Sequence, residues 1–154
     1  MVPECRIVSI GALAAHNLWN ESSPVRAGHM TTSLVEADGL RMIVDPSLPP
    51  ESLLPRLAER SSCSPNAVSH VFLTSLIPET MRGLEAFPEA DWLAFETELL
   101  AARSAANSAL EHESQHPEDG GAEHLQRLLA KLDRIQPAED SLARGVDLFP
   151  LPVV

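Results

Sequence analysis

The stretch from Val68 to Pro88 constrains the fold of this chain more than any other. A short apolar run, residues 71–73, stops at Thr74, and a polar turn containing Pro78 follows it. The residues from Met81 onward then predict a short helix. A short apolar run bounded by turn residues is typical of a buried strand, and the loops that follow such strands commonly carry function. The stretch therefore predicts a buried strand that delivers a loop to the edge of a sheet.

A β-hairpin is predicted around Asp38-Gly39. The flanking runs, Met30–Glu36 and Leu40–Val44, are rich in β-forming residues. Asp-Gly is a preferred two-residue turn between such strands because both central positions need a positive φ. The second strand ends in Asp45-Pro46, and an Asp before Pro is a good turn residue in any fold.

Further strands and helices are predicted along the rest of the chain. Arg6–Ile10 and Ala12–Trp19 indicate an opening strand or pair of strands, followed by a polar loop at Asn20–Gly28. Glu51–Arg60 predicts a helix that tolerates Pro55 only in its first turn. That helix joins two strands in a crossover, which should be right-handed and make them parallel. The remaining predicted elements are a strand at Ala90–Thr97, helices at Leu99–Glu113 and Glu123–Arg134, and a strand at Val146–Phe149.

The central stretch resembles the signature of the metallo-β-lactamase-fold hydrolases. In that family the buried strand ends in Thr-His-x-His-x-Asp-His and continues with a Gly and an apolar helix. Thr74 matches the family Thr. The metal-ligand positions of the motif are held, in order, by Ser75, Ile77, Glu79 and Thr80. The resemblance therefore implies the scaffold of the motif without its metal ligands.

Two other places extend this resemblance. Asp45 matches the acidic residue that closes the family hairpin, and Gly145–Phe149 is similar to a family strand that leads into Thr-Pro-Gly-His. Here Leu151–Val154 stands where that ligand segment belongs. The resemblance implies an α/β (α+β) fold, with a metallo-β-lactamase-like sheet and flanking helices. Residues 1–154 would form one such domain, about half of the αββα sandwich, with a helical segment at about 99–134.

Composition excludes several classes of partner. The formal net charge is −11, and Lys131 is the single lysine beside ten arginines. Such a chain repels phosphate backbones and anionic lipid, so we expect neither nucleic acid nor membrane as a partner. Cys5 and Cys63 are too few for a disulfide framework and are expected to be free thiols. No signal peptide is recognised, so we expect a cytoplasmic protein without a cofactor.

Alternative sites in the sequence are weaker. His112 and His116 are spaced i, i+4 and could hold a metal together with His124, although a solvated helix end is the simpler interpretation. His70 lies in the core strand. Ser75 lacks a Gly-x-Ser-x-Gly elbow, and Cys63 has only Arg60 nearby to activate it.

Three functions follow from these patterns. We prefer a non-catalytic relative of the metallo-hydrolases that acts as a binding or assembly module. Half of a two-sheet fold exposes apolar sheet surface, so we expect a homodimer or larger homo-oligomer in which two chains supply the two halves. The second is a metal-dependent hydrolase completed by a partner subunit or by the three histidines, and the third is a small-molecule binding protein that uses the cleft after Asp45 and Thr74.

Overall fold

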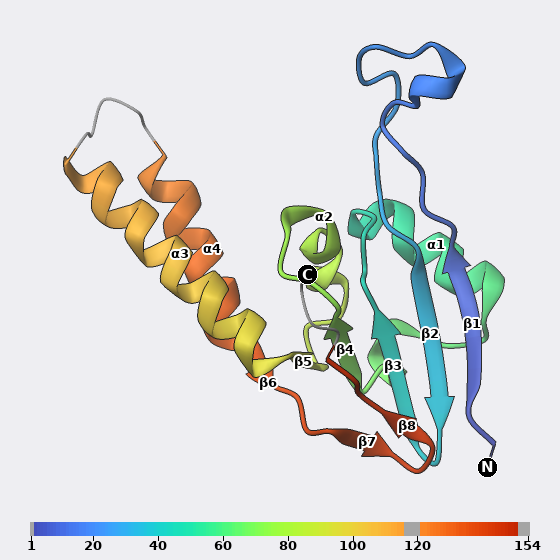
Figure 1. Cartoon of the computed structure of the whole chain (residues 1–154). Helices are drawn as coiled ribbons and strands as arrows, with labels where there is room; N and C mark the ends of the chain where they lie inside the picture. Colours follow the sequence, from blue (N-terminus) through green and yellow to red (C-terminus); the bar gives the residue numbers. More distant parts are fainter. Residues whose placement is uncertain (1, 116–120, 151–154) are drawn as a thin grey trace.

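A six-stranded mixed sheet forms the centre of the protein (Figure 1). The computed structural model describes residues 2–115 and 121–150. The strand order is β1-β2-β3-β4-β5-β6; β1 and β3 pair antiparallel with β2, and the pairings from β3 to β6 are parallel. The strands are β1 Glu4–Ser9, β2 Thr32–Ala37, β3 Leu40–Val44, β4 His70–Leu73, β5 Asp91–Ala94 and β6 Gln136–Pro137. The helices are α1 Pro50–Arg60, α2 Pro78–Met81, α3 Glu96–Gln115 and α4 Ala122–Arg134, with 3₁₀ turns η1 Asn17–Trp19, η2 Pro65–Ala67 and η3 Leu84–Ala86.

The predicted hairpin is confirmed. Asp38 and Gly39 have φ of 36° and 89°, and Ala37 pairs with Leu40 across the turn. The parallel pairing of β3 with β4 is confirmed as well. Because one turn sets the register of β2 and β3, Leu34 and Ile43 both point into the core and are fully buried.

Helix α1 packs on one face of the sheet through Leu53 and Leu57, which are fully buried. Pro55 lies in the sixth position of this helix, so the expectation that it must fall in the first turn is wrong. A proline there leaves the carbonyl of Glu51 without its helical donor. Both Glu51 and Pro55 are exposed, so water can hydrate that carbonyl.

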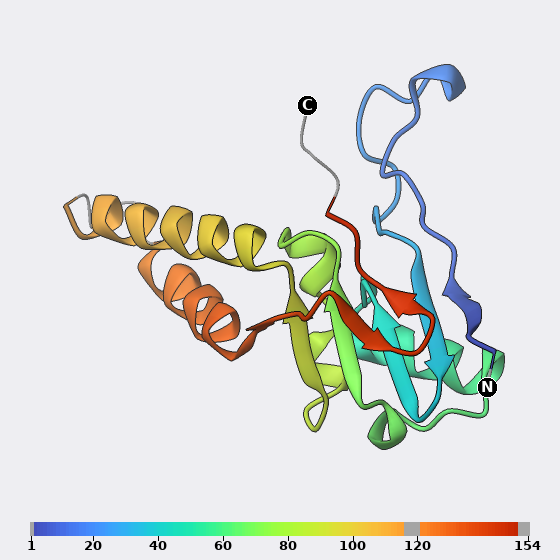
Figure 2. The same cartoon turned by 60° about the horizontal axis from the view of Figure 1, so that its bottom comes forward.

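The other face of the sheet is covered in its centre by a separate two-stranded sheet, β7 Ser141–Ala143 and β8 Val146–Asp147 (Figure 2). Residues of this small sheet pack over a second apolar cluster, whose buried members are Leu40, Met42, Phe72 and Leu93. The expectation of an uncovered apolar sheet face is therefore wrong for these residues. The exposed apolar remainder of this face lies at β1, where Ile7 is 51% exposed.

Helices α3 and α4 form a hairpin that extends away from the sheet (Figure 1). Both helices were predicted. Arg103 of α3 fixes the end of α4, since its Nη2 donates hydrogen bonds to the carbonyls of Leu132 and Ile135 at 2.9 and 3.1 Å. Carbonyl groups at a helix C-terminus lack intrahelical partners, so this arginine satisfies them.

Several element boundaries differ from the prediction. Ala12–Trp19 is not a strand; it pairs only through an isolated bridge between Ala12 and His29 and contains η1. Helix α2 begins at Pro78, before the predicted start at Met81, because a proline is well suited to the first helical position. The strand expected at Ala90–Thr97 ends at Ala94, and that expected at Val146–Phe149 ends at Asp147. Leu151–Val154 and His116 lie outside the described residues.

Candidate functional site

The carboxyl ends of β3 and β4 lie side by side because these strands are parallel neighbours. Asp45 follows β3 and Thr74 follows β4. Oδ1 of Asp45 accepts a hydrogen bond from the Thr74 backbone N–H at 2.9 Å, and Oδ2 accepts one from the Thr74 hydroxyl at 2.6 Å. The Asp45 carboxylate therefore links the two strand ends.

Burial dominates the ionisation of Asp45. Only 6% of the residue is exposed, and burial raises the pKa of the carboxyl, while the hydrogen bonds from Thr74 offset part of that increase. Among the described residues, no Lys, Arg or His forms an ion pair with Asp45. The backbone at Asp45 has φ of 50°, a left-handed conformation that Asp tolerates because its side chain is short and polar.

A second group of buried polar contacts lies under this link. The Thr32 hydroxyl donates to the carbonyl of Asp45 at 2.6 Å and accepts from the N–H of Ser47 at 3.2 Å. The Ser47 hydroxyl accepts from the N–H of Met30 at 2.6 Å. Thr32 and Ser47 are fully buried, so these bonds supply partners that water cannot. They join β2 to the turn after β3.

Among the residues at the family-motif positions, Thr80 is the one whose side chain bonds to the loop itself. Thr80 is fully buried. Its hydroxyl donates to the carbonyl oxygens of Ser75 and Ile77, at 2.6 and 2.9 Å. Ile77 is 41% exposed. Glu79, in the first turn of α2, is exposed and forms no hydrogen bond or ion pair with another described residue. Thr80 thus closes the loop where the family motif has its last histidine.

These residues do not fit a pair of zinc ions. Zinc in a hydrolytic site is held by His, Asp, Glu or Cys ligands that converge on the metal and leave a position for water. Ser75, Ile77 and Thr80 are not such ligands, and both carboxylate oxygens of Asp45 already accept hydrogen bonds from Thr74. Across residues 2–115 and 121–150, no group of three or more His, Cys, Asp and Glu side chains is arranged to hold a metal ion.

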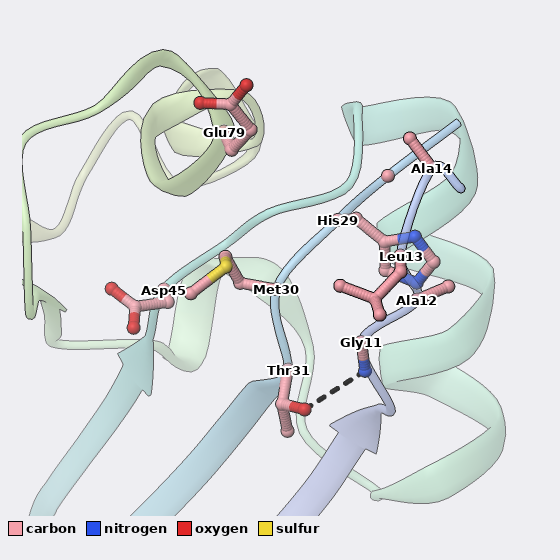
Figure 3. Close-up of a pocket in the computed structure, with 10 residues that line it drawn as sticks. Gly11, Ala12, Leu13, Ala14, His29, Met30, Thr31, Asp45 and Glu79 are labelled. Atoms are coloured by element: carbon pink, nitrogen blue, oxygen red, sulfur yellow. Dashed lines mark hydrogen bonds between the residues drawn. The ribbon is translucent and has the colours of Figure 1, made fainter. Parts of the chain in front are cut away.

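A cleft of about 560 Å³ lies beside Asp45 (Figure 3). It is lined by residues 11–14 and 28–31, together with Asp45 and Glu79. Figure 3 shows that the side chains of Asp45, Glu79 and His29 point in different directions. Nε2 of His29 lies 3.0 Å from the carbonyl of Ile10. The three titratable side chains therefore do not converge on one reacting atom.

A second cleft, of about 440 Å³, lies on the other face of the sheet. Its lining includes Thr74 and Ser75, together with Phe72 and Phe95, whose rings make an edge-to-face contact with centroids 5.6 Å apart. Thr97, Glu98 and residues 147–150 complete the lining. This cleft is largely apolar with a few polar groups, a lining that is typical of small-molecule sites.

The histidines singled out in the sequence lie elsewhere. His112 and His124 are exposed on α3 and α4, and His116 lies outside the described residues, so that metal site stays a prediction. His70 begins β4, at the opposite end of the strand from Thr74; its Nδ1 lies 2.9 Å from Ser69 Oγ and its Nε2 lies 4.0 Å from Asp91 Oδ2. Cys63 is buried, and burial raises the pKa of its thiol, which disfavours the reactive thiolate.

The segment from Ile10 to Thr31, which we call the arm, was not recognised as a candidate in the sequence. It projects beyond the sheet between β1 and β2 (Figures 1 and 2). The signal that could have found it is composition, since these residues include Leu18 and Trp19 and carry only Glu21 and Arg26 as charged side chains. The arm therefore combines large apolar side chains with a net charge of zero, on a chain whose net charge is −11.

The sheet order, the flanking helices and the linked strand ends define the class: this chain has the metallo-β-lactamase fold. It is similar to AidC, a dizinc quorum-quenching lactonase solved in complex with a product, with a TM-score of 0.53 and 17% identity over 71% of this chain and 43% of that one. It is also similar to a Thermotoga maritima protein provisionally named a metallo-β-lactamase, with a TM-score of 0.55 and 14% identity over 90% of this chain and 60% of that one.

The family resemblance seen in the sequence is confirmed at the level of the fold. This chain spans 43% and 60% of the length of these two proteins, about half. No model of a known protein family matches the sequence, and no curated protein matches it. Within the described residues, no helix has both the length and the apolar character to cross a membrane.

Proposed function

We propose that this chain is a non-catalytic protein of the metallo-β-lactamase fold that acts as a binding and assembly module. The observation that supports this function is the use of the strand-end residues. The Asp45 carboxylate accepts hydrogen bonds from Thr74, and the Thr80 hydroxyl donates to the backbone of the loop. A hydrolytic metal centre needs such groups to be available to the metal and its water. The fold is retained, and the groups that would perform hydrolysis serve its stability.

The test is elemental analysis of protein purified without chelator, combined with its mass in solution by light scattering. We expect far less than one zinc, iron or manganese per chain, no hydrolysis of lactone or β-lactam substrates, and a mass corresponding to at least two chains. One tightly bound metal per chain would overturn the proposal and favour the metal-dependent hydrolase, with ligands from a partner subunit or from His112, His116 and His124. His124→Ala would then be the next variant to analyse.

A small-molecule binding function is the second candidate, and the 440 Å³ cleft over Phe72 and Phe95 favours it. A ligand that binds only the folded state raises the melting temperature, and the stabilisation grows with the logarithm of its concentration above Kd. A thermal-shift screen of metabolites is therefore informative, and Ser75→Trp, which fills one side of the cleft, is expected to abolish any shift that arises there. A shift that survives in this variant would place the ligand elsewhere.

Two further properties belong to the proposal. We place the protein in the cytoplasm, because Cys5 is an exposed free thiol and Cys63 a buried one, as a reducing compartment allows. We also expect it to bind neither nucleic acid nor anionic membranes, given its charge of −11. Cell fractionation tests the first, and retention on heparin at low salt would contradict the second.

A further inference from the structure

The arm carries much of the apolar surface that this protein exposes. Leu18 is 89% exposed and Trp19 is 67% exposed. Six of the eleven large hydrophobic residues found exposed in the described part of the chain belong to the arm: Ile10, Leu13, Leu18, Trp19, Val25 and Met30. Large apolar surfaces on soluble proteins commonly mark interaction sites.

The arm is held in shape by its own contacts. Ala12 and His29 exchange two backbone hydrogen bonds, of 2.9 and 3.0 Å, at its base. Farther out, Arg26 ion-pairs with Glu21, and its guanidinium lies 5.5 Å from the centre of the Trp19 ring. These contacts fix the arm before any partner binds, which lowers the entropy cost of association.

Charge separates the arm from the rest of the protein. Its Glu21 and Arg26 cancel, so its formal net charge is zero, and the remaining residues carry the whole −11. Two copies of such a chain repel each other wherever their acidic surfaces meet. The arm is a place where two copies can touch without bringing like net charges together.

The arm also offers both halves of a self-complementary contact. Leu18 projects as an apolar knob. A hollow of about 400 Å³ lies beside it, lined by Gly11, Ala12, Leu13, His16, Trp19 and Arg26. In a two-fold arrangement the same patch of both copies takes part, so the knob of one copy meets the hollow of the other.

We propose that the arm is the surface through which two copies of this chain associate, with Leu18 of each copy in the hollow of the other. This inference rests on the proposed assembly function and names the surface that carries it. It differs from the expectation drawn from the sequence, in which the second face of the sheet made the contact.

The test compares Leu18→Glu with Leu100→Glu by analytical ultracentrifugation over a range of protein concentrations. Leu100 is the matched control, because it is 58% exposed and lies on α3, away from the arm. We expect the unmodified protein and Leu100→Glu to dimerise with the same Kd. Leu18→Glu is expected to raise the Kd by about tenfold or more, because its carboxylate would lose hydration in a hollow whose lining arginine, Arg26, is already paired with Glu21. Far-UV circular dichroism checks that both variants are folded.

Two additional measurements sharpen the test. Mixing Leu18→Glu with the unmodified protein should give a heterodimer of intermediate Kd, because one of the two symmetric knob-in-hollow contacts keeps its leucine. Raising the salt concentration should lower the dimer Kd of the unmodified protein, because salt screens the repulsion between two acidic chains more than it weakens a contact whose net charge is zero. A dimer weakened by salt would contradict a contact through the neutral arm.

The outcomes separate this inference from the function on which it rests. A dimer with the same Kd in Leu18→Glu as in the unmodified protein would overturn the arm as the contact and leave homodimerisation standing. A protein that stays monomeric at every concentration would overturn both. Stoichiometric metal would overturn the non-catalytic function and would not change the dimer measurement.

Discussion

The strand-end region around Asp45 and the arm both follow strands of the same sheet, yet they use their side chains in opposite ways. At the strand ends, Asp45, Thr74 and Thr80 bond to neighbouring groups of the loop. In the arm, Leu18 and Trp19 face solvent. One region satisfies its polar groups internally, and the other leaves large apolar side chains mostly exposed to solvent.

This difference teaches where a change of function can occur in a retained fold. Loops after parallel strands carry binding groups because the sheet positions them well, and they lose that role when their polar groups turn to the backbone. Apolar surface in a projecting loop adds little to the stability of the monomer, so such a loop is available for contact with a partner.

The largest effect is expected at Gly83, which supports the strand-end region. A Cβ built on Gly83 would lie 2.5 Å from the carbonyl oxygen of Leu48 and 2.8 Å from that of Pro46, and both are backbone atoms. We expect Gly83→Ala to lower the free energy of unfolding by about 3 kcal/mol, because the turn after β3 must move. Urea denaturation measures it. Gly121→Ala, where a Cβ meets only the flexible side chain of Glu113, is the control and should cost less than about 0.5 kcal/mol.

A smaller loss is expected when the link between β3 and β4 is cut. Asp45→Ala leaves the backbone N–H of Thr74 without its acceptor and places Ala in a left-handed conformation. The expected cost is about 2 kcal/mol. Asp45→Asn keeps an acceptor for that N–H and suits the left-handed conformation, so it should lose markedly less by thermal or urea denaturation. Equal losses in the two variants would show that the hydrogen bonds contribute nothing.

The raised pKa of Asp45 gives a pH dependence with a definite sign. An unfolded Asp has a pKa of about 3.9, and the folded value is higher because of burial. In the window between the two values the folded state binds more protons, so stability falls as pH rises through it. The contribution is complete below about pH 3.9 and is lost as pH passes the folded pKa. Asp45→Asn lacks this titration, so its stability relative to the unmodified protein should increase with pH. A constant difference from pH 3.5 to 7 would contradict the raised pKa.

The smallest effect is expected in the arm. Leu18→Ser at low protein concentration should change the free energy of unfolding by no more than about 0.5 kcal/mol, because Leu18 packs against little of its own chain. Urea denaturation of the monomer measures it. A loss of about 2 kcal/mol would mean that the arm belongs to the core, and the contrast between the two regions would fail.

Local signals explain how much of the fold the sequence predicted. The Asp38-Gly39 turn requires two positive φ values, and the apolar run before Thr74 is short and bounded by turn residues, which is typical of a buried strand. The helix pair α3 and α4 followed from helical residue preference and leucine spacing. The strands β6 and β7 are only two and three residues long and contain Pro137 and Ser141, so no periodicity was present to detect them.

The sequence predicted which residues stand at the site but not which partners their side chains bind. The sequence predicted Asp45 as a turn residue. It also predicted that the family's metal ligands are absent, because the residue types alone show that no histidine stands at the motif positions. The sequence could not reveal that Thr80 bonds to the carbonyls of Ser75 and Ile77, because the donor direction of a hydroxyl depends on the fold. It also gave no position for the arm, whose shape depends on the contacts of Arg26 with Glu21 and Trp19.

The two cysteines provide reporters of local opening. Cys5 is exposed on β1, whereas Cys63 is buried between α1 and β4, with its Sγ 3.4 Å from the carbonyl of Ser64. An alkylating reagent modifies Cys5 at the rate of an ordinary thiol but reaches Cys63 only when the connection after α1 opens. The ratio of the two alkylation rates, followed by mass spectrometry, therefore gives the free energy of that opening in the native protein. Cys5 serves as the internal reference for Cys63.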